Sequence, residues 1–336
     1  MSDVIVFDVA HGNCSLIRSQ DACGVVDAPR KALLLNTLED MGITCVDVAF
    51  ISHADKDHIA GVIGLLSSET IKLRKLYLNP DSQKQTKIWR DLRAAVKVSE
   101  RQGGCEVIPT LTTAMPGTVT VGDIEVRVEA PSASFALGGS GSTDEKGRRI
   151  TSNSISAVLR IRSGESPGLL LAGDIDEIGL DDALDNDRDL KARTLVFPHH
   201  GGLPASSDAA TFVDTVMRTV NPSLVIFSNG RGKHDNPRPE IVAQVAKAGC
   251  GIACTQLAHA CSKSTIFKEG HLESLRAQGQ EYGASCAGSM TIDIPGGGCR
   301  PASMHSAHQE FIDEAVETPM CRLAASGIDI PKVANS

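Results

Sequence analysis

The stretch Val46-Asp47-Val48-Ala49-Phe50-Ile51-Ser52 leads directly into His53-Ala54-Asp55-Lys56-Asp57-His58. The first part is mostly apolar and short, with β-branched side chains, a pattern typical of a buried strand. The second part holds two imidazoles and two carboxylates. The sequence therefore predicts a strand that ends at a sheet edge and delivers four polar side chains to the loop that follows.

These four side chains, His53, Asp55, Asp57 and His58, suit a divalent ion such as Zn²⁺, Mn²⁺ or Fe²⁺, because such ions take nitrogen and oxygen donors. The alternative is a polar loop that caps a helix over residues 59–66, since aspartates are favoured at helix starts. Capping explains one aspartate but not the four side chains together. We therefore predict a metal-binding loop.

Composition sets the broad class. The chain has 336 residues, of which 41% are hydrophobic, enough for a sizeable core. The acidic start Met1-Ser2-Asp3 lacks the basic region of a secretory signal, and no apolar stretch is long enough for a membrane span. We expect a soluble, cytoplasmic protein. The net charge of −8 and the aromatic content of 3% provide no general attraction for nucleic acid, so a polyanion must be bound locally.

Predicted strands and helices alternate along the chain, which indicates an α/β fold. Residues 87–98 have the spacing of an amphipathic helix that buries Trp89. Gly122-Asp123 is a hairpin turn signal between residues 118–121 and 124–128. Residues 131–150 are rich in Ser, Gly and charge, so we expect a mobile loop there, either a flap over the site or a plain surface loop.

An ordered set of motifs resembles the metallo-β-lactamase-fold hydrolases, and within them the hydrolase domain of the bacterial DNA-uptake protein ComEC and its stand-alone relatives. The motifs are Phe7-Asp8-Val9-Ala10-His11-Gly12-Asn13-Cys14, Val25-Val26-Asp27-Ala28, the run from His53 to His58, Ser152-Asn153-Ser154, Leu171-Ala172-Gly173-Asp174, Phe197-Pro198-His199-His200-Gly201-Gly202, and residues 228–237. The resemblance covers about residues 1–295 and implies an αββα sandwich of two mixed sheets flanked by helices. We expect this domain over residues 1–299 and a C-terminal appendage over 300–336.

The resemblance also implies a ligand set and one or two Zn²⁺ ions, with Asp174 as a bridge. The implied metal ligands are His53, Asp55, Asp57, His58, Asp174 and His199. Asp55 stands where the family usually has a histidine, and Asn153-Ser154 where many members provide another, so Mn²⁺ is the alternative ion. Asp8, His11 and Asp27 either support the site or satisfy turns.

Further roles are expected next to the ions. Adjacent side chains at an extended strand end point in opposite directions, so we assign His199 to the metal and His200, with Asp57 and His234, to catalysis. His234 suits protonation of a leaving oxygen. Substrate contacts are predicted for Arg231, Lys233, Arg238 and Asn153. The alternative for the segment around His234 is an exposed basic turn.

Cysteines concentrate near the C-terminus. Cys254, His259, Cys261 and Cys286 provide four side chains of the kind that hold a structural zinc ion. Free thiols packed as small apolar side chains are the alternative. In a chain of this length without an export signal, free thiols or metal ligation are expected in preference to disulfides.

The expected function is a metal-dependent hydrolase that acts through metal-activated hydroxide on phosphodiester bonds, as a nuclease or nucleotide phosphodiesterase. The expected partner is therefore a nucleic acid or nucleotide substrate, with no membrane; any protein partner and the oligomeric state stay open. One alternative is a thioester, lactone or lactam hydrolase of the same fold. The other is a non-catalytic metal-binding or partner-binding module.

Overall fold

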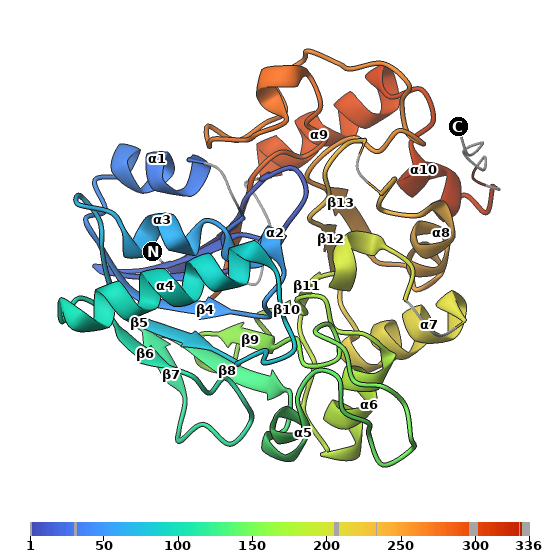
Figure 1. Ribbon diagram of the computed structural model, residues 1–336. Coiled ribbons are helices and arrows are strands. Elements are labelled where there is room, and N and C mark those ends of the chain that lie inside the picture. The colour runs from blue at the N-terminus through green and yellow to red at the C-terminus, as the bar shows by residue number, and fades with distance from the viewer. Residues whose placement is uncertain are drawn as a thin grey trace.

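Two seven-stranded mixed sheets form the centre of the molecule (Figure 1). The computed structural model describes residues 2–29, 32–204, 208–232, 234–295, 302–328 and 330. The first sheet has the order β14-β1-β2-β3-β4-β5-β6 and the second β13-β12-β11-β10-β9-β8-β7. The strands of the first sheet are β1 (Ser2–Val6), β2 (Ser15–Ser19), β3 (Ala22–Val26), β4 (Cys45–Ile51), β5 (Lys72–Leu78), β6 (Glu106–Ile108) and β14 (Met290–Asp293). Those of the second are β7 (Val119–Val121), β8 (Ile124–Ala130), β9 (Val158–Arg162), β10 (Leu169–Leu171), β11 (Thr194–Val196), β12 (Leu224–Phe227) and β13 (Gly251–Cys254).

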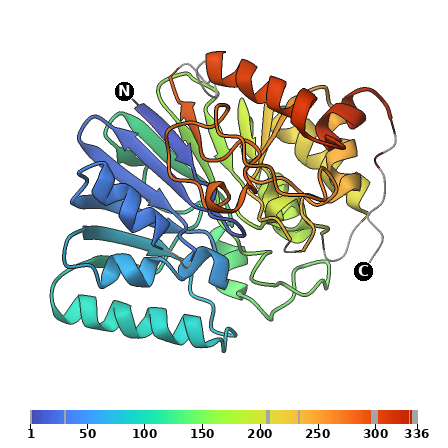
Figure 2. The same cartoon turned by 90° about the horizontal axis from the view of Figure 1, so that it is seen from above.

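Helices cover the outer faces of both sheets, which confirms the predicted αββα sandwich (Figures 1 and 2). Over the first sheet lie α1 (Leu33–Asp40), α3 (Val62–Leu66) and α4 (Lys87–Arg101), and the short α2 (Lys56–Ile59) follows β4. Over the second lie α6 (Glu177–Asp185), α7 (Ala209–Val220) and α8 (Pro239–Lys247). The remaining helical segments are α5 (Ala133–Gly138), η1 (Pro198–Gly201), η2 (Gln280–Tyr282), α9 (Ala302–Ala315) and α10 (Met320–Ala325).

The core has layers that match this architecture. Val6 and Phe50 of the first sheet pack with Leu159 and Ile226 of the second, so the two sheets bury their inner faces against each other. Trp89 is buried against the first sheet, as the helical spacing predicts. The Gly122-Asp123 hairpin is confirmed, because β7 and β8 pair antiparallel with Val121 opposite Ile124.

The C-terminal part of the chain, from β14 onward, is joined to the rest of the sandwich in two ways. β14 pairs antiparallel with β1, and Phe311, Ile312 and Val316 of α9 share a small apolar cluster with Leu257 and Cys286. The expected boundary near residue 299 stays a prediction, because residues 296–301 lie outside the described residues. No described helix has the length and apolar character needed to cross a membrane.

Strand direction explains where polar side chains gather. β3, β4 and β5 run parallel in the first sheet, and β10, β11, β12 and β13 run parallel in the second. Parallel neighbours in a sheet end at the same edge, where ligands of α/β sheets usually bind. The loops after β3, β4, β10, β11 and β12 contain the polar motifs singled out from the sequence.

Candidate metal centre

Three histidines converge from both sheets. His53 follows β4, His58 lies in α2, and His200 lies in η1 after β11. All three are buried, with at most 3% of their surface exposed. Asp174 follows β10 and is 4% exposed. Burial of three imidazoles and a carboxylate in one place is costly unless the groups are paired or bind a cation.

Each imidazole is oriented by a hydrogen bond at Nδ1. His58 Nδ1 donates to Asp27 Oδ2 at 2.7 Å, and His200 Nδ1 donates to the Ser228 carbonyl at 2.8 Å. His53 Nδ1 lies 3.1 Å from Ser52 Oγ, which itself donates to Asp27 Oδ2 at 2.7 Å and so can accept from His53. With Nδ1 occupied, the lone pair of each Nε2 is directed inward, as in metal-binding histidines.

The inward atoms form a cradle. Asp174 Oδ1 lies 3.4 Å from His58 Nε2 and 3.7 Å from His200 Nε2, and Asp174 Oδ2 lies 3.8 Å from His53 Nε2. Among the described residues, none of these three Nε2 atoms nor Asp174 Oδ1 has a hydrogen-bond partner. Ligand atoms of His53, His58 and Asp174 lie within 4.8 Å of one another. Nitrogen and oxygen donors in this arrangement fit a divalent ion.

The pKa values of His53 and His58 shift in opposite directions. Burial, together with the neighbouring His58, lowers the pKa of His53 to about 4, so this imidazole is neutral at physiological pH. Burial also tends to lower the pKa of His58, but Asp174 and Asp27 outweigh it and raise the pKa well above its usual value. Burial raises the pKa of Asp174, yet His200 and His58 outweigh it and hold the pKa well below its usual range. The two carboxylates therefore favour a positive charge at His58.

A second group of candidate metal ligands lies next to the group of His53, His58 and Asp174. Ligand atoms of His11, Asp57 and His200 also lie within 4.8 Å of one another, and His11 Nε2 is 2.9 Å from Asp57 Oδ2. A Cβ at Gly230 would lie 2.4 Å from His11 N, so only glycine lets the His11 loop approach this closely. The sequence left open whether His11 supports the site or satisfies a turn, and it did not predict His11 as a candidate ligand. Its separation of 46 positions from Asp57 left no spacing signal.

The pair His199-His200 is arranged differently from the extended strand end that the sequence predicts. His200 is the buried one, and its Nε2 also lies 3.5 Å from Asp57 Oδ2. The side chain of His199 is 41% exposed and its Nδ1 lies 3.2 Å from Asp174 Oδ2. β11 ends at Val196, and both histidines have left-handed backbones with φ of 54° and 56°, so the alternation of an extended strand does not apply. His200 is therefore the stronger ligand candidate, and His199 lies at the rim.

Asp55 also differs from the expectation. It belongs to neither group of candidate ligands, and its Oδ1 accepts a hydrogen bond from Lys84 Nζ. Asp55 Oδ2 lies 3.8 Å from His53 Nε2. Asp27 has the supporting position that the sequence left undecided, since it bonds both His58 and Ser52. Asp8 instead accepts hydrogen bonds from Gln256, Gly279, Ser285 and Ala10, which ties the N-terminal loop to the C-terminal segment.

Two clefts open onto the centre. The larger, of about 610 Å³, is lined by His11, Asp55, Asp57, His234 and Arg238 among others. The smaller, of about 310 Å³, is lined by Lys84, Asn153 and Phe212 among others. Asp174 and His199 line both clefts. The structure thus brings His234, Arg238 and Asn153 to the centre, next to the candidate ligands.

Arg231 does not reach this centre. Its guanidinium donates hydrogen bonds to the main-chain carbonyls of Leu257, Ala258, Ser262, Lys263 and Ser264. An arginine bound to five carbonyls holds the C-terminal segment together, so the prediction that it contacts substrate is corrected. Lys233, the other predicted basic contact, lies outside the described residues.

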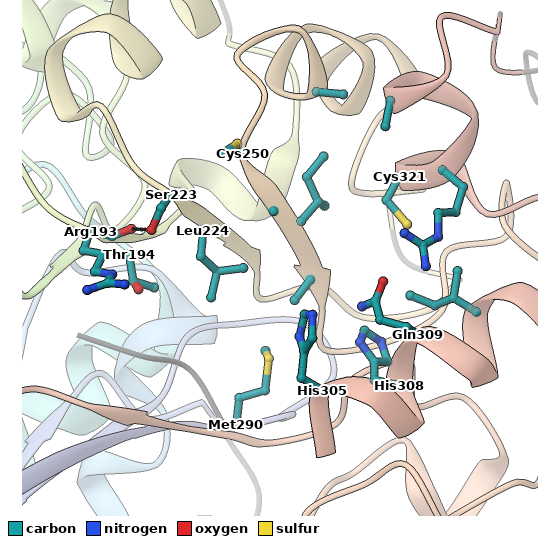
Figure 3. A pocket seen from close by; sticks show the side chains of 17 residues that line it. Arg193, Thr194, Ser223, Leu224, Cys250, Met290, His305, His308, Gln309 and Cys321 are labelled. Carbon is teal, nitrogen blue, oxygen red and sulfur yellow. Dashed lines mark hydrogen bonds between the residues drawn. The ribbon is translucent and has the colours of Figure 1, made fainter. Parts of the chain in front are cut away.

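The predicted cysteine site is not assembled as expected. His259 is half-exposed and its Nδ1 lies 3.8 Å from Asp235 Oδ1, while Cys254, Cys261 and Cys286 line a small apolar cavity with Cys321 and His308. Within the described ranges, no group that includes a cysteine has its ligand atoms within 4.8 Å of one another. A separate cavity of about 390 Å³ lies beside β13, α9 and α10. Among the described residues, none that was predicted for a site lines it, and Figure 3 shows Leu224, Met290 and His305 at its wall.

Comparisons with known proteins give similarity in structure alone. No family model and no curated protein matches the sequence. The metallo-β-lactamase-fold protein YhfI from Bacillus subtilis is 12% identical, over 76% of this chain and 96% of that one, with a TM-score of 0.46. Igni18, a metallo hydrolase from Ignicoccus hospitalis, is 12% identical over 74% of this chain and 94% of its own, with a TM-score of 0.42. A diphosphatase of the PhnP family is 11% identical over 72% of this chain and 80% of its own, with a TM-score of 0.39. At these scores, none of the three tells what this chain binds or cleaves.

Proposed function

We propose that this chain is a metal-dependent hydrolase that cleaves phosphodiester bonds, as a nuclease or a nucleotide phosphodiesterase. The observation that carries the proposal is the set of four buried donor atoms without hydrogen-bond partners among the described residues: His53 Nε2, His58 Nε2, His200 Nε2 and Asp174 Oδ1. Leaving a buried polar atom unpaired costs about 1–3 kcal/mol. Four such atoms in one cradle indicate a bound cation.

The donor set favours zinc. Three imidazole nitrogens and one carboxylate oxygen are typical Zn²⁺ ligands, and the Lys84 contact of Asp55 removes the oxygen donor that favoured Mn²⁺. A divalent ion in this place supplies a Lewis acid and lowers the pKa of water. Asp27, Ser52 and the Ser228 carbonyl orient the three imidazoles for it.

The residues around the ion have separate tasks. Burial raises the pKa of Asp57, but the nearby imidazoles of His11 and His200 outweigh it and hold the pKa well below its usual value. Asp57 is therefore a carboxylate at neutral pH that orients a water molecule by accepting its hydrogen bond. His234 lines the same cleft, and its ring centroid lies 4.9 Å from that of His11. An imidazole in this position is suited to donate a proton to a leaving oxygen.

One basic side chain at each cleft supports a phosphate substrate over a neutral one. Arg238 lines the larger cleft and Lys84 the smaller, in a protein whose net charge is −8. The larger cleft also contains Asp55, Asp57, Asp174 and Asp235, so a bound divalent ion together with Arg238 would supply the positive charge that attracts an anion. Arginine pairs well with phosphate oxygens. A lactam, lactone or thioester has no charge at the reacting group that would require these cations.

The test begins with metal content. The protein purified with Zn²⁺ or Mn²⁺ is assayed for bound metal and then for cleavage of bis-p-nitrophenyl phosphate, single-stranded DNA, RNA, cyclic dinucleotides and nitrocefin. We expect product in the phosphate set, and loss of both metal and product in His58→Ala. The control His305→Ala changes an exposed histidine at the separate cavity and keeps both.

Each result has a clear meaning. Turnover of nitrocefin alone assigns the protein to lactam hydrolysis and overturns the phosphodiester proposal. Absence of bound metal in the wild-type protein overturns the hydrolase proposal and favours a partner-binding module. Metal binding without turnover of any phosphate substrate also contradicts the proposed activity.

A further inference from the structure

Lys84 was not predicted to belong to the site, but it contacts Asp55, which was predicted as a metal ligand. Its Nζ donates hydrogen bonds to Asp55 Oδ1 and, at 3.0 Å, to Ser152 Oγ. Asp55 was expected to bind metal, but it joins neither group of candidate ligands. The Lys84–Asp55 pair lies at the border of the two clefts, since Asp55 lines the larger and Lys84 the smaller.

The lysine is held in place by its surroundings. Its backbone N–H donates to Asp81 Oδ1 at 3.1 Å, and Ser152 Oγ donates to Asp81 Oδ2. Asp81 is buried, with 2% of its surface exposed. Lys84 is itself mostly buried, with 18% of its side chain exposed. Such a network is unlike an exposed surface ion pair, which contributes little and orders poorly.

One N–H group of the Lys84 ammonium is available to a ligand. A lysine ammonium carries three N–H groups. Asp55 and Ser152 accept two of them, and the described residues provide no acceptor for the third. The wall of the smaller cleft also contains Asp174 and His199, so Lys84 shares a cleft with the candidate metal centre.

We propose that Lys84 is a fixed cation of the centre with two tasks: it keeps Asp55 out of the metal coordination, and it binds an anionic oxygen of the substrate. This inference rests on the proposed phosphodiester hydrolysis and names a further substrate-binding residue for it. Asp55 is neutralised by the ammonium, and the remaining N–H forms a charge-assisted hydrogen bond with a phosphate oxygen, of the kind that is stronger than a neutral one.

The first experiment measures Zn²⁺ affinity by competition with a chelating dye. The double variant Asp55→Asn/Lys84→Met removes the pair without changing the net charge, and we expect an affinity within about threefold of wild type. Asp174→Asn, which removes a proposed ligand, is expected to weaken binding by about a hundredfold or more. A loss of tenfold or more in the double variant would show that Asp55 binds the ion and overturn the inference.

The second experiment measures binding of inorganic phosphate to the zinc-loaded protein by calorimetry. We expect Lys84→Met to weaken phosphate binding by about tenfold, equivalent to 1.4 kcal/mol, and Lys84→Arg to recover most of it because the charge is kept. The matched control is Lys87→Met, three positions along the chain, whose side chain is 81% exposed and pairs with Asp91. Thermal unfolding confirms that each variant is folded.

The outcomes separate the two proposals. Equal phosphate affinity in Lys84→Met and wild type overturns the role of Lys84 while metal-dependent hydrolysis stands. If the wild-type protein binds no Zn²⁺, the proposed function fails, and phosphate titration of the metal-free protein with the same variants still decides whether Lys84 binds an anion.

Discussion

His58 Nδ1 lies 2.7 Å from Asp27 Oδ2, and both side chains are almost completely buried. The two residues are 31 positions apart and follow the neighbouring parallel strands β3 and β4. Asp27 also accepts hydrogen bonds from the main-chain N–H and the hydroxyl of Ser52. One carboxylate thus orients the start of the predicted metal-binding loop and one of its histidines.

We predict that Asp27→Asn weakens Zn²⁺ binding by about 10–100-fold, as is typical for partners of metal-binding histidines. The amide keeps the shape of the carboxylate but loses the charge that makes the His58 imidazole a good donor. Competition with a chelating dye measures the change. The control Asp91→Asn, on α4, changes a side chain that is 42% exposed and pairs with Lys87, and it should leave the affinity unchanged. Equal affinities in the two variants would contradict the assigned role.

The two adjacent histidines should behave differently. We expect His200→Gln to weaken Zn²⁺ binding by about a hundredfold and His199→Gln by less than about tenfold, because only His200 Nε2 is buried without a partner among the described residues. The same dye competition distinguishes them. A larger loss in His199→Gln would restore the assignment made from the sequence alone.

Strand ends were predictable from the sequence, and the contacts between them were not. Apolar runs followed by polar motifs identify β4, β10 and β11, because burial and turn chemistry act on neighbouring residues. The choice between His199 and His200 depends on two left-handed residues that no periodicity signals. The Lys84 contact with Asp55 joins positions 29 apart in different loops, and only the folded chain reveals it.

Arg231 should matter for stability and not for substrate binding. We predict that Arg231→Met lowers the free energy of unfolding by about 2–4 kcal/mol, because buried carbonyls lose their donors. Arg231→Lys should also destabilise, since one ammonium cannot replace the planar guanidinium. Urea unfolding measures both, with exposed Arg218→Met of α7 as the control. A raised KM with unchanged stability would instead indicate a substrate contact.

Asp8 is expected to be a stability residue as well. Burial raises its pKa, and hydrogen bonds from Gly279, Ala10, Gln256 and Ser285 oppose that effect. Asp8→Ala leaves these donors without an acceptor and should lower the free energy of unfolding by about 2–4 kcal/mol. Urea unfolding beside the exposed control Asp21→Ala tests this. A difference below about 0.5 kcal/mol between the two variants would contradict it.

Burial of the Cys23 thiol predicts that the stability of the folded protein depends on pH. Burial, reinforced by Asp47, raises the pKa of Cys23 to about 12, above the value of about 8.5 for an unfolded thiol. The folded protein therefore holds this proton more tightly, and the contribution to stability is lost as pH rises from about 8.5 towards 12. At pH 9, iodoacetamide should label Cys23 at least about a hundredfold more slowly in the native protein than in urea, measured by peptide mass spectrometry. Equal rates would show that the thiol is accessible and ionised.

The pairing of β1 with β14 joins residues 3–6 to residues 290–293. All of the candidate ligands precede residue 201 in the chain. A ribosome therefore synthesises every ligand before it synthesises the strand that completes the first sheet. During translation, one edge of β1 stays unpaired until residues 290–293 have emerged.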